Sequence, residues 1–287
     1  MSLRVLDPGL LALIEDEGRP GYAALGVGRS GAMDRGALRT ANRLLGNAPD
    51  AAGIELLGAG FTARFDSDAW FSLAGGAGIA TLDGRAVDRL LPALAPAGSV
   101  LRLGPLRAGL RRLLAIRGGV AVPAMLGSRS RDTLSALGPE PLRAGDELPI
   151  GAAPHPVRSV DWWPLDAPGP DVRLDVHPGP RLDRLPEGTW QRLLAGPWRV
   201  SGDADRVGIR LLGAPLPTGD AGELASEGLV HGSVQLPPSG RPVVFGPDHP
   251  VTGGYPVVAV VDSASLDLLA QLTPGSSVLL RAARRQG

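Results

Sequence analysis

Short apolar runs separated by Gly and Pro recur along the whole chain. Each run is three to six residues long, which is typical of short β-strands. The strands that this pattern predicts cover residues 10–14, 61–65, 70–73, 100–103, 113–116, 172–176, 243–245 and 256–261. The pattern therefore indicates a mainly β protein.

Helical patterns are fewer and shorter. The clearest predicts a helix over 34–45, where Asp34 is placed to cap the first turn and Gly46 to end the helix in the left-handed conformation. Two further helices are expected over 186–194 and 266–272. Together they account for a small part of the chain, so the protein is expected to be mostly β.

The composition supports a turn-rich globular fold and excludes several kinds of chemistry. Gly occurs 41 times and Pro 28 times in 287 residues, about twice the usual share, yet 44% of the residues are apolar and can build a core. Cys is absent, which excludes disulfides, thiolate metal sites and cysteine nucleophiles. All 29 basic residues are arginine, so Schiff-base chemistry and a Walker A phosphate loop, which need lysine, are excluded.

The net charge and the search for membrane-spanning and signal segments bear on partners and location. The formal net charge is zero, which argues against a nucleic-acid binder. We find no apolar stretch long enough to span a membrane and no signal peptide, so no membrane association and a cytoplasmic location are expected.

A proline-rich stretch divides the sequence into two halves. Pro has no amide hydrogen and a fixed φ, so the cluster of five prolines within 152–170 is unsuited to a sheet interior. We therefore predict an N-terminal β-barrel-like half over 1–151, a linker over 152–170 and a C-terminal half over 171–287.

The densest group of chemically useful residues lies between positions 226 and 256. Gln235 precedes a Pro-Pro turn, Asp248 follows an apolar strand, and Gly253, Gly254 and Tyr255 come shortly after. Paired glycines let a ligand approach the main chain closely, and the three polar side chains suit a small amide or ureido compound with both donors and acceptors. The alternative is a hairpin with a Gly-Gly turn and a structural Tyr.

Other motifs carry less weight. Gly26 to Gly31 fits G-x-G-x-x-G, but no buried strand precedes it, which argues against a dinucleotide site. The four histidines have no metal-ligand spacing, and no metal is expected. Ser128 is either a nucleophile or a turn residue.

Several segments in order along the chain form recognisable motifs. They are Asp16-Glu-Gly-Arg-Pro-Gly21, Gly26 to Asp34, Arg117-Gly-Gly-Val120, Leu126-Gly-Ser-Arg-Ser130, Asp205-Arg-Val-Gly-Ile-Arg-Leu211, Gly232 to Pro238 and Asp248 to Pro256. With these motifs the chain resembles the allophanate hydrolase subunit 2 or KipA family, and the resemblance runs from Leu3 to Leu280. This family includes the C-type subunit of 5-oxoprolinase and half of the carboxyltransferase region of urea carboxylase. The chain departs from the usual family pattern at Arg131, Arg181, Pro250 and Val251.

The resemblance implies two cyclophilin-like β-barrel halves and an enzyme that works with partners. The partners it implies are a KipI-like, subunit-1-type protein equivalent to the B-type subunit of 5-oxoprolinase, and the A-type subunit of that enzyme. The activity it implies is ATP-dependent opening of 5-oxoproline, a small-molecule lactam, to glutamate.

Roles on the matching positions follow from this interpretation as hypotheses. Asp248 would orient a ring N–H or act as a base, and Gln235 and Tyr255 would hydrogen-bond the carbonyl group. The substrate or an anion, including the phosphates of ATP, would be bound by Arg206, Arg129, Ser128, Gly253 and Gly254.

Two alternatives stay open. One is the transferase half of a biotin-dependent urea-carboxylase or allophanate-type system, with biotin bound by this chain. The other is a non-catalytic KipA-like regulator that binds a KipI-like inhibitor through an exposed apolar patch.

Overall fold

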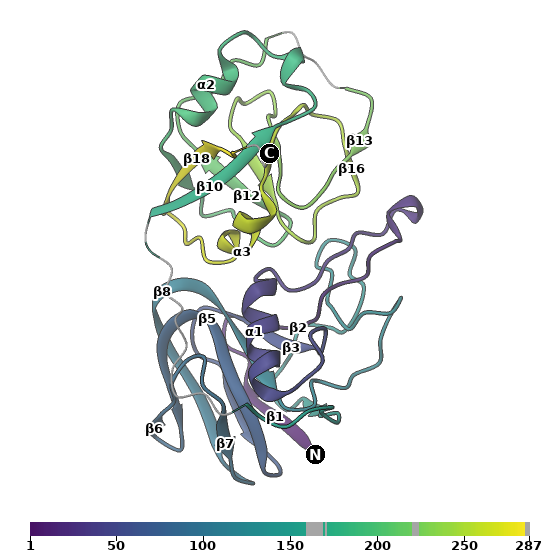
Figure 1. Ribbon diagram of the computed structural model, residues 1–287, viewed down its shortest axis with the longest axis vertical. Helices are drawn as coiled ribbons and strands as arrows, with labels where there is room; N and C mark the ends of the chain where they lie inside the picture. Colours follow the sequence, from purple (N-terminus) through teal and green to yellow (C-terminus); the bar gives the residue numbers. More distant parts are fainter. Residues whose placement is uncertain (159–168, 170, 220–223, 285–287) are drawn as a thin grey trace. The chain divides into compact units, whose positions relative to one another are not determined.

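The computed structural model describes residues 1–158, 169, 171–219 and 224–284. The chain forms two compact units, each assembled from more than one segment (Figure 1). The first unit contains residues 1–19, 30–132 and 136–168, and the second contains 20–29, 133–135 and 169–287. The predicted linker over 152–170 lies largely outside the described residues, and the proposed domain limits stay a prediction. No helix among the described residues is long and apolar enough to cross a membrane.

The first unit is built on a curled nine-stranded sheet. Its main path runs β2-β3-β8-β4-β1-β9, and β5 pairs with β8 and also with β6 and β7. The strands are β1 (Ser2–Asp7), β2 (Leu11–Glu15), β3 (Gly53–Leu57), β4 (Thr62–Phe65), β5 (Ala69–Leu82), β6 (Arg85–Ala86), β7 (Ala93–Ala95), β8 (Val100–Ile116) and β9 (Glu147–Pro149).

One helix, α1 (Arg35–Leu45), packs on β5 and β8 of this sheet (Figure 1). The Oδ1 atom of Asp34 accepts a hydrogen bond from the main-chain N–H of Ala37 at 2.8 Å, and Gly46 ends the helix at a φ of 68°. The predicted start, cap and end of this helix are therefore confirmed. Its apolar face is fully buried, because Leu38, Leu44 and Leu45 join a cluster with residues of the sheet.

The second unit is a closed seven-stranded barrel with the strand order β10-β17-β14-β15-β12-β11-β18. The parallel pair β10–β18 closes it. Its strands are β10 (Asp171–Pro178), β11 (Trp198–Val200), β12 (Gly208–Leu212), β14 (Ser233–Gln235), β15 (Val243–Phe245), β17 (Val257–Val261) and β18 (Ser277–Ala282), and a separate two-stranded ribbon joins β13 (Glu227–Gly228) to β16 (Thr252–Gly253).

The short helices are α2 (Thr189–Leu194), α3 (Leu266–Leu269) and three 3₁₀ turns at Ala23–Leu25, Leu182–Arg184 and Ser263–Ser265. The mainly β prediction, with two β halves and few helices, is confirmed. The helices predicted over 186–194 and 266–272 are present but shorter than expected. Gly188, at a φ of 80°, precedes α2 and delays its start, because that conformation does not belong to a right-handed helix.

The two strands predicted over 100–103 and 113–116 are one long strand, β8. The separation was wrong because residues 104–110 are half-buried or exposed, so polar residues and glycines interrupt the apolar pattern while the ladder with β5 continues. Three register shifts between Gly75 and Ala80 bend β5 where it follows β8.

Candidate functional site

Asp248 and Arg206 form a buried ion pair in the second unit. Asp248 follows β15, and Arg206 precedes β12, which pairs with β15. Between β15 and Asp248, Gly246 passes so close to the chain that a Cβ atom there would lie 2.2 Å from the carbonyl oxygen of Arg206. A glycine is therefore required for this approach, which places the carboxylate beside the guanidinium.

Arg206 and Thr133 both donate hydrogen bonds to the carboxylate of Asp248. Arg206 donates from Nε to Oδ2 at 2.8 Å and from Nη2 to Oδ1 at 3.1 Å. Thr133 donates to Oδ2 from its main-chain N–H at 3.0 Å and from its hydroxyl at 2.7 Å. Asp248 is 0% and Arg206 3% exposed. Donors arranged in this way stabilise the charged carboxylate, which makes it a strong anchor for Arg206.

Gln235 and Gly253 meet at the end of β14. The side-chain Nε2 of Gln235 donates a hydrogen bond to the main-chain carbonyl of Tyr255 at 3.0 Å. A Cβ atom on Gly253 would lie 2.5 Å from the same nitrogen and 2.9 Å from Cδ1 of Leu229. The structure therefore brings together three of the predicted site residues, and the glycine allows the amide of Gln235 to keep its position.

Tyr255 lines a hollow of about 250 Å³ in the second unit. Its other walls come from Leu185, Thr218, Gly219, Leu236, Pro238 and Pro256. The hollow is mostly apolar, and Tyr255 and Thr218 are the lining residues whose side chains carry hydroxyl groups. Sites for small molecules commonly combine apolar walls with a few polar groups of this kind.

The ribbon that carries Gly253 is held by an ion pair. Arg181 donates from Nε to both carboxylate oxygens of Glu227, at 2.7 and 2.9 Å, and also from Nη2. Glu227 lies opposite Gly253 in the β13–β16 register. The arginine that departs from the usual family pattern at position 181 therefore has a structural partner in this chain.

The segment around Gly253 is also held by hydrogen bonds to its main-chain carbonyl groups, which do not depend on the identity of the side chains. Gly254 accepts a hydrogen bond from the N–H of Leu224 at 2.8 Å, and Val251 accepts one from the N–H of Leu229 at 2.9 Å. Both contacts use carbonyl oxygens. The departure at Val251 therefore leaves this pairing intact.

Ser128 and Arg129 lie in the first unit, around the carboxylate of Asp16. Ser128 and Ser130 each donate a hydroxyl hydrogen bond to Oδ1 of Asp16 at 2.6 Å, and the N–H of Arg129 donates to Oδ2 at 2.6 Å. The Nε of Arg129 donates to the carbonyl of Val122 at 2.7 Å. This network holds the loop after position 126 against the end of β2, and Ser128 is fully buried within it.

Sequence reasoning assigned no role to Asp16, Arg19 or Thr133. Arg19 is 1% exposed and donates from Nη2 to the carbonyl of Ser130, and its Nε and Nη1 have no hydrogen-bond partner among the described residues. Asp16 and Arg19 belong to a motif that carried the family resemblance, which was the available signal. Thr133 lay outside every quoted motif, so nothing in the sequence pointed to it.

A family model confirms the resemblance. The model described as "Carboxyltransferase domain, subdomain A and B" matches residues 25–282. The C subunit of the Escherichia coli 5-oxoprolinase is 33% identical over 96% of this chain and 89% of its own length. The corresponding subunit of Haemophilus influenzae is also 33% identical, over 98% of this chain and 91% of its own length.

Longer proteins share the same region. The urea amidolyase of Saccharomyces cerevisiae is 31% identical, and the match covers 96% of this chain but 16% of that protein. The solved structure of the Kluyveromyces lactis urea amidolyase has a TM-score of 0.91 to this chain at 27% identity, covering 99% of this chain and 19% of that one. The solved structure of TTHA0988 has a TM-score of 0.90 at 38% identity, covering 98% of this chain and 55% of that one.

Proposed function

This chain belongs to the carboxyltransferase domain family, and from that premise we propose that it is part of an ATP-dependent complex that opens the lactam 5-oxoproline to glutamate. The observation that carries the proposal is the match to two C subunits of 5-oxoprolinase, which runs over nearly the full length of this chain and of each relative. The urea amidolyase matches, in contrast, cover small parts of much longer chains.

The chemistry of a lactam explains why such a complex consumes ATP. An amide carbon is a poor electrophile, and transfer of the terminal phosphoryl group of ATP to the carbonyl oxygen makes it reactive toward water. Water adds to that carbon, the ring C–N bond breaks with the nitrogen taking up a proton, and a second water releases phosphate. The products are glutamate, ADP and phosphate.

We propose that the lactam contacts the hollow beside Tyr255. Its volume of about 250 Å³ suits one small ring compound, and the hydroxyls of Tyr255 and Thr218 are available as donors to a carbonyl group. Gln235 holds the main chain of Tyr255 in place. Gly253 and Gly254 shape the segment that carries it.

In this proposal Asp248 positions Arg206 and does not act as a base. The buried carboxylate already accepts hydrogen bonds from Arg206 and Thr133. The bidentate contact fixes the orientation of the buried guanidinium and thereby joins the segments before β12 and after β15. ATP would then be bound with a partner protein, by arginine and main-chain N–H groups of this chain, because the chain lacks the lysine of a Walker A loop.

The test is reconstitution with the A-type and B-type 5-oxoprolinase proteins of the same organism. We expect ADP release that depends on 5-oxoproline and equals glutamate formation. The chain has two tyrosines, so Tyr22→Phe is a matched control for Tyr255→Phe. Loss of one hydrogen bond to the reacting carbonyl should lower kcat by about 10²-fold in Tyr255→Phe and leave Tyr22→Phe unchanged. Equal activity of both variants would remove Tyr255 from the site.

A second candidate is the transferase half of a biotin-dependent system. It is favoured by the family description and by the close fold match to the Kluyveromyces lactis enzyme. Free biotin should then raise the thermal unfolding midpoint of the chain, and 5-oxoproline should not stimulate ATP hydrolysis in the complex. Formation of a stable complex with neither property would instead favour the KipA-like regulator.

A further inference from the structure

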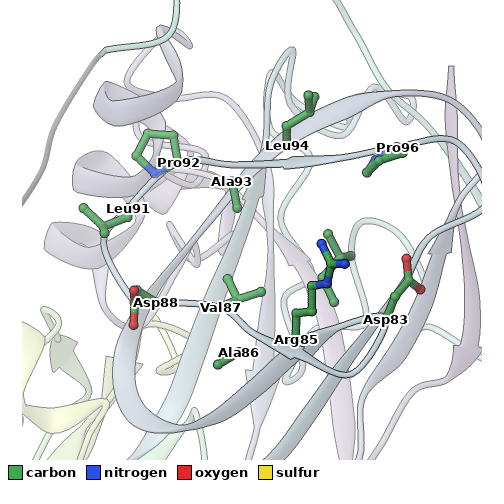
Figure 2. A pocket seen from close by; sticks show the side chains of 11 residues that line it. Asp83, Arg85, Ala86, Val87, Asp88, Leu91, Pro92, Ala93, Leu94 and Pro96 are labelled. Carbon is green, nitrogen blue, oxygen red and sulfur yellow. The ribbon is translucent and has the colours of Figure 1, made fainter.

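A separate hollow lies in the first unit, and none of the family motifs named above lines it. It has a volume of about 660 Å³ and is lined by residues between Leu82 and Pro96 (Figure 2). Small-molecule sites typically occupy about 300–1,000 Å³, so its size is in the range for an organic ligand. The whole lining comes from a single continuous stretch of chain.

The two arms of chain that line this hollow are hydrogen-bonded to β5. The chain leaves β5 through Asp83 and Gly84, both at positive φ (49° and 79°), forms β6, and returns along β7. Between these strands the N–H groups of Val87 and Leu90 donate to carbonyls of β5 at 3.0 and 2.7 Å. A site pinned at several points keeps its shape without a ligand, and a preformed site avoids the cost of ordering on binding.

The walls combine apolar side chains with one guanidinium. Figure 2 shows Arg85 extending from the lower arm into the space between the two arms, between Val87 and Asp83. Leu82 and Leu91 add to the apolar lining. No described residue makes a hydrogen bond or an ion pair with the side chain of Arg85, so its donor set is available to a ligand.

The charges of the lining restrict the type of anion. Asp83 and Asp88 also line the hollow, and Oδ1 of Asp83 accepts a hydrogen bond from the N–H of Val100 at 2.8 Å. Figure 2 shows Asp83 near Arg85 and Asp88 at the far end of the same arm, so the lining carries two carboxylates against one guanidinium and disfavours phosphates and other polyanions more strongly than a single charge. One carboxylate matches the planar fork of an arginine, and an apolar body matches the rest of the walls.

We propose that this hollow binds an apolar monocarboxylate through Arg85. The shared chemistry has two sources, a free organic acid and the carboxyl terminus of a peptide with apolar side chains. The proposal does not depend on the proposed function, because it concerns a different unit and its test measures binding to this chain alone.

The test is calorimetric titration of the full chain with octanoate, with octanamide as the uncharged analogue. We expect saturable 1:1 binding of octanoate, and binding of octanamide that is weaker by about tenfold or more, because the amide loses the charge-assisted hydrogen bonds. Arg85→Gln should weaken octanoate binding by a similar factor. Arg85→Lys keeps the charge but loses the planar fork of donors, so its affinity for octanoate should lie between those of the wild type and Arg85→Gln.

Arg107→Gln is the matched control, because Arg107 is another exposed arginine of the first unit and does not line the hollow. Its affinity should stay at the wild-type value. Titration with acetyl-Leu-Leu-Leu as the free acid separates the two sources, since tighter binding of the peptide than of octanoate identifies a carboxyl terminus and the reverse a free acid. Absence of saturable octanoate binding, or equal affinity in wild type and Arg85→Gln, would overturn the proposal.

Discussion

At the residue scale, the buried pair of Arg206 and Asp248 is expected to make a large contribution to the stability of the second unit. Removal of one member of a buried pair leaves the other charged and without its partner, which costs about 3–5 kcal/mol. We expect Asp248→Ala to lower the free energy of unfolding by this amount in urea titrations. Asp248→Asn keeps an acceptor for Thr133 and should cost less.

The control for this prediction replaces both charges. The double variant Arg206→Met with Asp248→Leu removes the cost of an uncompensated buried charge and should be more stable than Asp248→Ala. If it is instead less stable than Asp248→Ala, the pair contributes through its hydrogen bonds and not through charge compensation.

Gly253 is the second sensitive residue. In Gly253→Ala the new methyl group would lie 2.5 Å from Nε2 of Gln235 and would displace the amide from the carbonyl of Tyr255. We expect a loss of about 1–3 kcal/mol in the free energy of unfolding, from one hydrogen bond and local overcrowding. Gly228→Ala, in the paired strand, meets no atom within 4 Å and should be tolerated. Similar unfolding midpoints for both variants would contradict the packing of Gln235 on Gly253.

The same residues show which contacts of the site can be predicted from local sequence and which cannot. The identity of Gln235, Gly253 and Tyr255 as one group follows from their spacing around a strand end and a glycine pair. The contact of Thr133 with Asp248 joins positions 115 residues apart and depends on the path of the chain, so no local pattern contains it.

At the element scale, the β13–β16 ribbon carries a partly exposed ion pair between Arg181 and Glu227. The hydrogen bond from Arg181 holds the pKa of Glu227 below its usual value, and the same contact raises the pKa of Arg181. A carboxylate with a depressed pKa in the folded state contributes stability above its unfolded pKa of about 4.3. That contribution is lost as the pH falls through the lower folded pKa.

We therefore expect Glu227→Gln to unfold at a lower temperature than the wild type at pH 6 and at the same temperature near pH 2. The difference should be small, because exposed ion pairs contribute little. Thermal unfolding followed by circular dichroism between these two pH values measures it. Glu187→Gln is a control whose carboxylate has no ion pair with a described residue, and it should follow the wild type throughout. A difference for Glu227→Gln that persists unchanged at pH 2 would rule out the ionised contact as its cause.

The bounds of helix α1 could be predicted from the sequence, whereas the length of strand β8 could not. The bounds of α1 follow from the side chain of Asp34, an apolar stripe and Gly46, all of which act within a few residues. The length of β8 is decided by pairing with β5 and β3, which supplies hydrogen bonds to residues whose own pattern is irregular.

At the scale of the whole molecule, closure of the barrel couples strands that lie about a hundred positions apart. β18 pairs in parallel with β10 and antiparallel with β11. Leu280, on β18, is buried, so Leu280→Ala should cost about 2–5 kcal/mol. Because the strands share one closed ladder, amide hydrogen exchange should accelerate in β10 and β11 as well as in β18.

Leu279→Ala is the matched control, since Leu279 is the adjacent residue on the opposite face and is half-buried. It should cost less and should leave exchange in β10 near the wild-type rate. Faster exchange confined to β18 in Leu280→Ala would show that the strand opens by itself and that closure does not couple the barrel.

The sequence by itself determined the β-rich class, the helix at 35–45, the family, and the exclusions that follow from the absence of Cys and Lys. These properties depend on composition, on spacing within about ten residues, or on short motifs that occur in a fixed order along the chain. They need no knowledge of which strands are neighbours.

The tertiary structure alone decided the closure of the seven-stranded barrel, the burial of Asp248 against Arg206 and Thr133, and the hollow around Arg85. Each of these depends on which segments meet in space. The free energy of such contacts comes from burial and hydrogen bonding between distant residues, and a one-dimensional pattern does not specify those pairings.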